Sequence, residues 1–140
     1  MPSGNAVAAL ALSRLARLTG EMRWREAADL QFAYLAGAVQ RCPAGHGFAL
    51  LAMLEELWPS AELVCAAETC PAALSDFLRG KPRPGLTVLV KTAAEAERLA
   101  ALAPFTAGYP IPPQGARYYL CRGRTCASPV DTVEALEQLL

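Results

Sequence analysis

Two cysteines near the end of the chain carry the clearest potential for chemistry. Cys121 and Cys126 are separated by four residues, and Arg122 and Arg124 lie between them. A neighbouring cation favours the thiolate form of cysteine, which is the form that attacks disulfides, is oxidised or binds metal. The pattern therefore predicts either a redox-active thiol pair modulated by the two arginines, or a structural pair that packs the loop or forms a static bridge.

The expected secondary structure places this pair where functional groups of α/β proteins collect. Residues 117–121 read as a strand, so Cys121 lies at a strand end and Cys126 lies in the loop that follows. A disulfide between them is geometrically possible if their α-carbons come within about 7 Å of each other. The structural and the redox interpretations both stay open at this point.

A second cysteine pair raises the alternative of a zinc site. Cys65 and Cys70 are also separated by four residues, so the two pairs together could supply four thiolates. Cys65, however, falls inside an expected buried strand, where free cysteine acts as a small apolar side chain. We therefore expect no metal and no cofactor, and we expect Cys65 in the core.

The remaining polar candidates have ordinary structural explanations. His46 is the one histidine, and it stands between two glycines with no carboxylate close in sequence to orient it, so we expect a helix-entry or surface residue. Glu55 and Glu56, and likewise Glu95 and Glu97, are expected on solvent-facing helix surfaces rather than across a cleft, as glycoside hydrolysis would require. Catalytic activity of this chain alone is therefore not expected, and the thiols are the only redox candidates.

Composition limits the partners. Thirteen basic residues match thirteen acidic ones, so no net charge attracts nucleic acid or an anionic membrane. No apolar run approaches the roughly 20 residues that span a bilayer, and the basic start of a signal peptide is missing, so we expect a cytoplasmic protein. Hydrophobic residues make up 54% of the chain. This content predicts a partner, either the remainder of a longer chain or a second copy in a homodimer.

The N-terminal part of the chain reads as helical. Apolar residues recur at helical spacing from residue 5 to about residue 58, with breaks at Gly20 and Pro43. Ser3 or Asn5 can cap the first helix. The spacing predicts three helices, the first two forming an antiparallel hairpin, at residues 5–19, 22–40 and 47–57. We therefore assign residues 1–60 to a helical part.

The hydrophobic period changes after residue 60. Short apolar runs bounded by proline and glycine predict three strands, at residues 62–66, 86–90 and 117–121. Three further helices are predicted, at residues 71–78, 93–102 and 130–140. Alternating strands and helices favour parallel pairing with right-handed crossovers. We therefore predict an α/β fold in which a helical hairpin and a third helix pack on a small three-stranded parallel β-sheet with crossover helices, with residues 61–140 as a small α/β lobe that carries the Cys-x4-Cys loop.

Several segments together resemble a known family. They are residues 2–9, 17–20, 103–105, 119–122, 125–126 and 129–130. The most specific are Ser3-Gly4-Asn5 and the run Cys121-Arg122, Thr125-Cys126 and Pro129-Val130. These segments are similar to the C-terminal end of YyaL-like proteins, which are relatives of the spermatogenesis-associated thioredoxin-like protein. The resemblance covers essentially all 140 residues here but only the last part of such a protein.

The resemblance implies a large parent protein. Members of the family carry an N-terminal thioredoxin-like domain, then a six-hairpin α/α toroid similar to sugar epimerases and glycoside hydrolases, and then a short α/β tail. By this likeness, the helices here would end the toroid and residues 61–140 would be the tail. The toroid mouth would be lined by a ligand-binding edge, Ser3, Gly4 and Asn5, although plain helix capping explains the same residue types. The residues that fall outside the family pattern are Cys42, His46, Cys65 and Cys70.

Three functions follow as hypotheses. The first is a non-catalytic C-terminal module of a thioredoxin-domain/α,α-toroid protein, which contributes packing and part of a pocket wall. The second is thiol redox work through Cys121 and Cys126, alone or as a relay for a thioredoxin-like domain. The third is part of a carbohydrate-binding or carbohydrate-processing toroid. The first is preferred, because the parts that the family's other activities need are absent from these residues.

Overall fold

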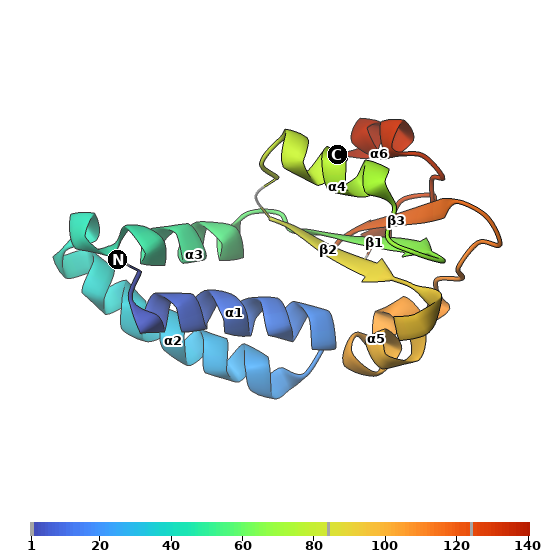
Figure 1. Ribbon diagram of the computed structural model, residues 1–140. Coiled ribbons are helices and arrows are strands. Elements are labelled where there is room, and N and C mark those ends of the chain that lie inside the picture. The colour runs from blue at the N-terminus through green and yellow to red at the C-terminus, as the bar shows by residue number, and fades with distance from the viewer. Residues whose placement is uncertain (1, 84, 124) are drawn as a thin grey trace. The chain divides into compact units, whose positions relative to one another are not determined.

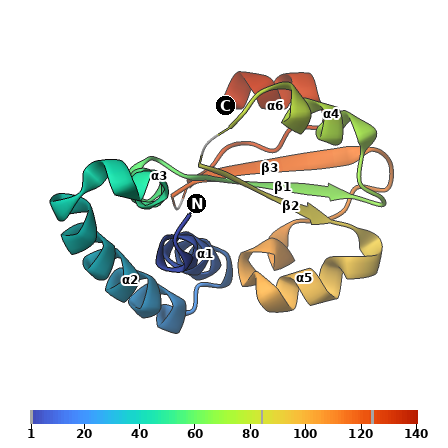
Figure 2. The same cartoon turned by 60° about the vertical axis from the view of Figure 1, so that its left-hand side comes forward.

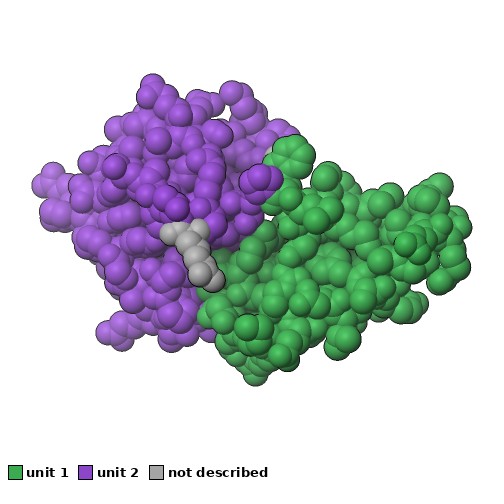
Figure 3. Space-filling view, turned by 180° about the vertical axis from the view of Figure 1, so that it is seen from behind, with its two compact units in different colours: residues 1–58 green, residues 59–140 purple. Residues whose placement is uncertain are grey.

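The computed structural model describes residues 2–83, 85–123 and 125–140 (Figure 1). These residues form six α-helices and one four-stranded sheet. The chain divides into two compact units, Met1–Trp58 (unit 1) and Pro59–Leu140 (unit 2), which are coloured separately in Figure 3. Within the described ranges, no helix combines the length and the apolar character that a bilayer crossing requires.

Unit 1 is built from three helices and one 3₁₀ turn: α1 (Gly4–Thr19), α2 (Met22–Arg41), η1 (Pro43–His46) and α3 (Gly47–Leu57). Figure 2 shows α1 nearly end-on beside both α2 and α3. Small side chains let the helices approach closely, because Ala6 and Ala9 of α1 share a buried cluster with Leu35 of α2 and Ala49 of α3. The three helices predicted from the apolar spacing are present.

Local signals set the ends of these helices. Ser3 caps α1, because its Oγ accepts a hydrogen bond from the backbone N–H of Ala6 at 3.2 Å. The first helix ends at Gly20, whose φ of 72° lies in the left-handed region that glycine adopts without strain. Pro43 opens the 3₁₀ turn that separates α2 from α3.

Unit 2 alternates strands with helical segments: β1 (Ala61–Ala67), α4 (Ala72–Gly80), β2 (Leu86–Lys91), η2 (Ala93–Glu95), α5 (Ala96–Leu102), η3 (Pro104–Gly108), β3 (Ala116–Arg122), β4 (Thr125–Cys126) and α6 (Val133–Leu139). The strand order is β2-β1-β3-β4. Strand β1 is parallel to β2 and antiparallel to β3, and β3 is antiparallel to β4. The fold is therefore mixed α/β.

The sheet differs from the predicted three parallel strands, because it is mixed and β3 runs against β1. The prediction of a crossover connection between β2 and β3 is wrong, because β3 is antiparallel to β1. The segment between β2 and β3 holds α5, η3 and a proline-rich stretch, and it returns the chain to the end of the sheet where β2 finishes. Ala67, the last residue of β1, therefore lies opposite Ala116, the first residue of β3.

The fourth strand was not expected at all, because two residues are too few to show a period-2 pattern. Strand β4 forms because Gly123, with a φ of 62°, turns the chain back directly after β3. Arg122 then pairs with Thr125, and Cys121 pairs with Cys126. The loop expected to hold the second cysteine is thus the return strand of a hairpin.

Each face of the sheet carries its own apolar cluster. One face presents residues of β1 and β3 to α4 and α6, and its buried members include Leu63, Cys65, Leu74, Tyr118, Leu120 and Leu136. The other face packs against the segment between β2 and β3, and its members are Val64, Ala66, Tyr119, Leu89, Tyr109 and Ile111. Figure 1 shows α4 and α6 on one side of the sheet and α5 on the other. The cysteine pair lies on the second face, because Cys121 shares the alternation of Tyr119.

Candidate functional site

The two cysteines of the predicted pair are joined by a disulfide. Cys121 of β3 and Cys126 of β4 are directly opposite in the antiparallel register, with an S–S distance of 2.07 Å. Their α-carbons are 3.9 Å apart, which is below the limit of about 7 Å for a bridge and slightly shorter than the usual range of about 4.4–6.8 Å. The hairpin therefore brings together the two thiols that the sequence singled out.

The two sulfurs differ in surroundings. Cys121 belongs to the sheet and is only 7% exposed, whereas Cys126 lies on the exposed two-residue strand. A disulfide reacts when a thiolate attacks one sulfur and the other leaves, so access decides which sulfur is attacked. The arrangement presents one sulfur to the surroundings and keeps the other in the sheet.

Tyr109 completes the site, and sequence reasoning missed it. Its hydroxyl oxygen lies 3.2 Å from Sγ of Cys121 and 3.4 Å from Sγ of Cys126. Sulfurs in a disulfide carry no hydrogen, so the tyrosine O–H is the donor, and its one hydrogen serves one of the two sulfurs at a time. Its position in a proline-rich stretch, distant in sequence from both cysteines, gave no signal of this role.

Two side chains hold Tyr109 in place. The ring of Tyr119 stacks on it with centroids 4.3 Å apart and planes 12° from parallel. Lys91, buried at the end of β2, donates hydrogen bonds from Nζ to the carbonyl oxygens of Thr106, at 2.7 Å, and Tyr109, at 2.8 Å. Tyr119 also donates its hydroxyl hydrogen to the carbonyl of Pro110 at 3.1 Å. The donor is therefore fixed by its ring and by its backbone.

The electrostatics of the site keep the tyrosine protonated. Burial is the main cause that raises the pKa of Tyr109, and the neighbouring Tyr119 and Glu62 raise it further. Glu62 of β1 lies opposite Cys121 in the sheet register. A group that stays protonated is available as a donor over the whole physiological pH range.

Of the two arginines expected to modulate the thiols, the structure describes only Arg122. Arg122 donates from Nη2 to the carbonyl oxygens of Leu139, at 2.7 Å, and Leu140, at 3.3 Å, so it is tied to the end of α6. Arg124 lies outside the described residues. The hydrogen-bond donor that the structure places on the sulfurs is thus a tyrosine, from a segment that sequence reasoning did not connect with them.

Ser3, Gly4 and Asn5, the proposed ligand-binding edge, lie at the start of α1. A surface pocket of about 400 Å³ is lined by Ser3 together with His46 and its neighbours before α3. His46 is held by a contact of 2.8 Å between its Nδ1 and the carbonyl oxygen of Cys42. The structure thus brings Ser3 and His46 to one pocket, although sequence reasoning treated them separately.

The other three cysteines are free thiols. Cys65 is fully buried on the opposite face of the sheet, and burial raises its pKa to about 11. Cys42 and Cys70 are exposed free thiols. In the part of the chain that the structure describes, no group of three or more His, Cys, Asp or Glu side chains is arranged to hold a metal ion.

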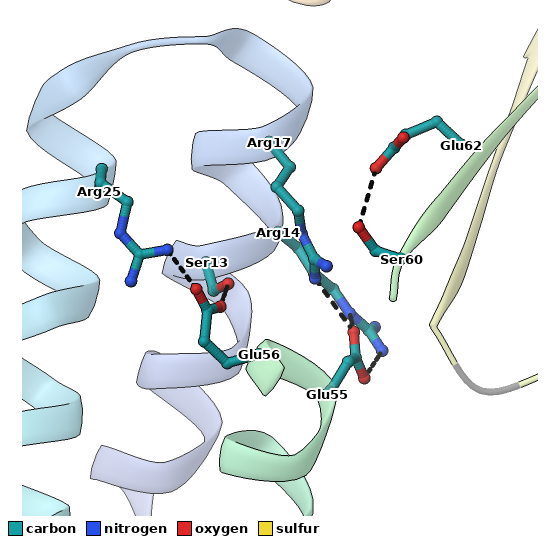
Figure 4. Close-up of polar contacts among 8 residues, drawn as sticks. All are labelled: Ser13, Arg14, Arg17, Arg25, Glu55, Glu56, Ser60 and Glu62. Atoms are coloured by element: carbon teal, nitrogen blue, oxygen red, sulfur yellow. Dashed lines mark hydrogen bonds and ion pairs between the residues drawn. The ribbon is translucent and has the colours of Figure 1, made fainter. Parts of the chain in front are cut away.

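A second polar cluster lies inside unit 1, where sequence reasoning expected solvent-facing carboxylates (Figure 4). Glu55 accepts two hydrogen bonds from Arg14, at 2.7 and 2.8 Å, and a third from Arg17 at 3.3 Å. These partners, Arg14 first, hold the pKa of Glu55 below its usual value. Glu56 accepts hydrogen bonds from Ser13 and Arg25. The expectation of a solvated face at these two residues is therefore wrong, because α1 and α2 supply cations that α3 alone does not reveal.

Comparison with known proteins adds no relative. No family model matches the chain, and neither the curated proteins nor the solved structures include a match.

Proposed function

We propose that this chain is a non-catalytic, C-terminal module of a larger cytoplasmic thioredoxin-domain/α,α-toroid protein. In this proposal unit 1 supplies the last helices of the toroid and packs against the helices before it. The support is one observation: large apolar side chains are exposed along α2 and α3. They are Met22, Leu30, Tyr34, Leu50, Leu51, Leu54 and Leu57.

The distribution of polarity in unit 1 strengthens this proposal. Leu57 is 84% exposed, whereas the side chain of Glu55, two residues earlier on the same helix, is only 17% exposed. A surface helix of an independent domain normally shows the reverse pattern. In unit 1, Glu55 and Glu56 are paired with arginines of neighbouring helices, whereas large apolar side chains of α2 and α3 are exposed. This arrangement is expected of a helix layer inside a larger array.

The exposed apolar side chains form a stripe along each helix, because they recur at helical spacing. Leu50, Leu54 and Leu57 follow one another at intervals of four and three residues, which places them on one face of α3. Leu30 and Tyr34 are likewise four residues apart on α2. Such stripes suit the helix-to-helix packing of a toroid, in which each hairpin covers the apolar face of the next.

The experiment that tests this proposal measures self-association of the isolated chain by light scattering. We expect the wild-type chain to associate, and the double variant Leu54→Lys/Leu57→Lys to shift to monomer, because two charges then interrupt the apolar face that these residues share with Leu50. Leu102→Lys is the matched control, since Leu102 is exposed on α5 of unit 2. A wild-type chain that stays monomeric and binds no apolar dye would contradict the proposal. An open reading frame upstream of residue 1 that encodes a thioredoxin-like domain would support it.

A second candidate function is thiol–disulfide exchange through Cys121 and Cys126. The observation that favours it is the Tyr109 hydroxyl donating to the sulfurs at 3.2 and 3.4 Å. In a reducing compartment a disulfide that forms is transient, and exchange with other thiols is its ordinary fate. The test is a thiol count in denaturant, which should rise from three in the oxidised chain to five after equilibration with a dithiol. A count that never changes would exclude this function.

A further inference from the structure

We infer that the disulfide of this chain is opened in one order only: a thiolate of a dithiol partner attacks Sγ of Cys126, and Cys121 leaves as a thiolate that Tyr109 stabilises. This inference rests on the exchange reaction proposed above as the second candidate function. It assigns Tyr109 as a catalytic residue and names the partner class, a protein or small molecule that carries two thiols.

Reduction of the chain takes two thiol–disulfide exchange steps. The partner thiolate forms a bond to Sγ of Cys126, and the bond between the two chain sulfurs breaks, so its electron pair leaves with Sγ of Cys121. The second partner thiolate then attacks the partner sulfur of this mixed disulfide and releases Cys126 as a thiolate. The partner is oxidised to a disulfide, the chain is reduced by two electrons, and the protons lost by the partner thiols end on Cys121 and Cys126.

Access determines which sulfur is attacked. Cys126 lies on β4, where both residues of the strand are exposed, and Cys121 is buried in β3. An incoming thiol reaches the sulfur of the exposed residue without disturbing the sheet. A nucleophile directed at Cys121 would have to displace neighbours that pack on the same face, among them the ring of Tyr109.

The position of Tyr109 determines which sulfur leaves. A single hydroxyl hydrogen serves one acceptor at a time, and the shorter of its two contacts, 3.2 Å, is to Cys121. As negative charge develops on this sulfur, the hydrogen bond becomes charge-assisted and strengthens. Glu62 of β1 lies opposite Cys121 in the register and raises the pKa of Tyr109, so the tyrosine keeps the hydrogen that it donates.

Lys91 and Tyr119 act as positioning residues for this step. The lysine fixes the backbone of Tyr109 through its carbonyl oxygen at 2.8 Å, and Tyr119 fixes the ring by stacking. Neither side chain touches a sulfur through a hydrogen bond in the described part of the chain. The donor is thus held in place before the thiolate forms, and no rearrangement is needed when it does.

The first experiment locates the mixed disulfide. Reduced Cys121→Ser and Cys126→Ser variants are treated with glutathione disulfide, and the adducts are located by peptide mapping, which separates them from adducts on the exposed Cys42 and Cys70. Because both directions of exchange pass through the same mixed disulfide, we expect the adduct on Cys126 to form roughly tenfold faster than that on Cys121. A faster adduct on Cys121 would overturn the order. If the wild-type thiol count also never changes, the exchange function fails as well.

The second experiment tests the donor. The rate of reduction of the oxidised chain by dithiothreitol should fall roughly tenfold in Tyr109→Phe, because the hydrogen bond to the leaving thiolate is lost. Tyr34→Phe removes the same hydroxyl from an exposed tyrosine of unit 1 and should leave the rate unchanged. An unchanged rate in Tyr109→Phe would remove Tyr109 from the reaction. The adduct mapping needs no tyrosine variant, so it decides the order of attack even if Tyr109→Phe does not fold.

Discussion

Replacing Glu55 by glutamine tests the polar cluster of unit 1. The carboxylate accepts three hydrogen bonds, two of them the parallel pair from Arg14, and its side chain is 17% exposed. A buried hydrogen bond to a charged group contributes about 1.5–3 kcal/mol, and an exposed ion pair about 0–1 kcal/mol. Arg14 is half exposed, so screening by water reduces its share. We expect Glu55→Gln to lower the free energy of unfolding of unit 1 by about 1.5 kcal/mol.

The assay follows from where the tryptophans lie. Both tryptophans of the chain, Trp24 and Trp58, belong to unit 1, so their fluorescence during urea unfolding reports on this unit. Glu26→Gln, a change of the same kind at an exposed position of α2, is the matched control and should change the free energy by less than about 0.5 kcal/mol.

The pH dependence provides a second criterion for the same variant. Because the pKa of Glu55 is lowered in the folded state, its contribution to stability is fully present above pH 4.5, the ordinary pKa, and is lost as the pH falls through the lower folded value. The difference between wild type and Glu55→Gln should therefore shrink in acid. A difference near zero at neutral pH, or one that is constant down to the acid limit of folding, would refute the reasoning.

Three further substitutions have expected costs. Lys91→Met leaves the carbonyl oxygens of Thr106 and Tyr109 without their buried donor, and near-UV circular dichroism should show unit 2 destabilised by about 2 kcal/mol. Thr132→Ala removes the side chain that caps α6, which should cost about 1 kcal/mol in urea unfolding, and an unchanged midpoint would show that the cap contributes nothing. Gly20→Ala meets no atoms within 4 Å, so its cost of about 1 kcal/mol, measured by tryptophan fluorescence, would arise from the positive φ alone.

Helix positions were predictable because their signals are local. Gly20 and Pro43 interrupt the apolar spacing, and the helices of unit 1 begin and end beside them. The direction of β3 was not predictable, because it depends on whether the segment after β2 crosses the sheet once or returns, and no short pattern encodes that path. The result is a mixed sheet in place of the expected parallel one.

The candidate site was predictable only in part, for the same reason. Cys121 and Cys126 are close in sequence, so their pairing could be considered from spacing alone, and the structure joins them. Tyr109 and Lys91 reach the site through tertiary packing, and no local sequence pattern indicates their contacts. The ion pairs of Glu55 were not predictable for the same reason, since its partners come from another helix and are 38 and 41 residues away in sequence.

The place of β1 in the sheet has a consequence for how the chain folds. β1 is the first strand of unit 2 along the sequence, yet it lies between β2 and β3 and needs both to satisfy its backbone. During synthesis, one edge of β1 therefore stays unpaired until Ala116–Arg122 has been made. The hairpin of α1 and α2, in contrast, can form as soon as its own residues have been made. The helical unit is expected to be the early folding nucleus, and the sheet is expected to be the slow, aggregation-exposed step of maturation.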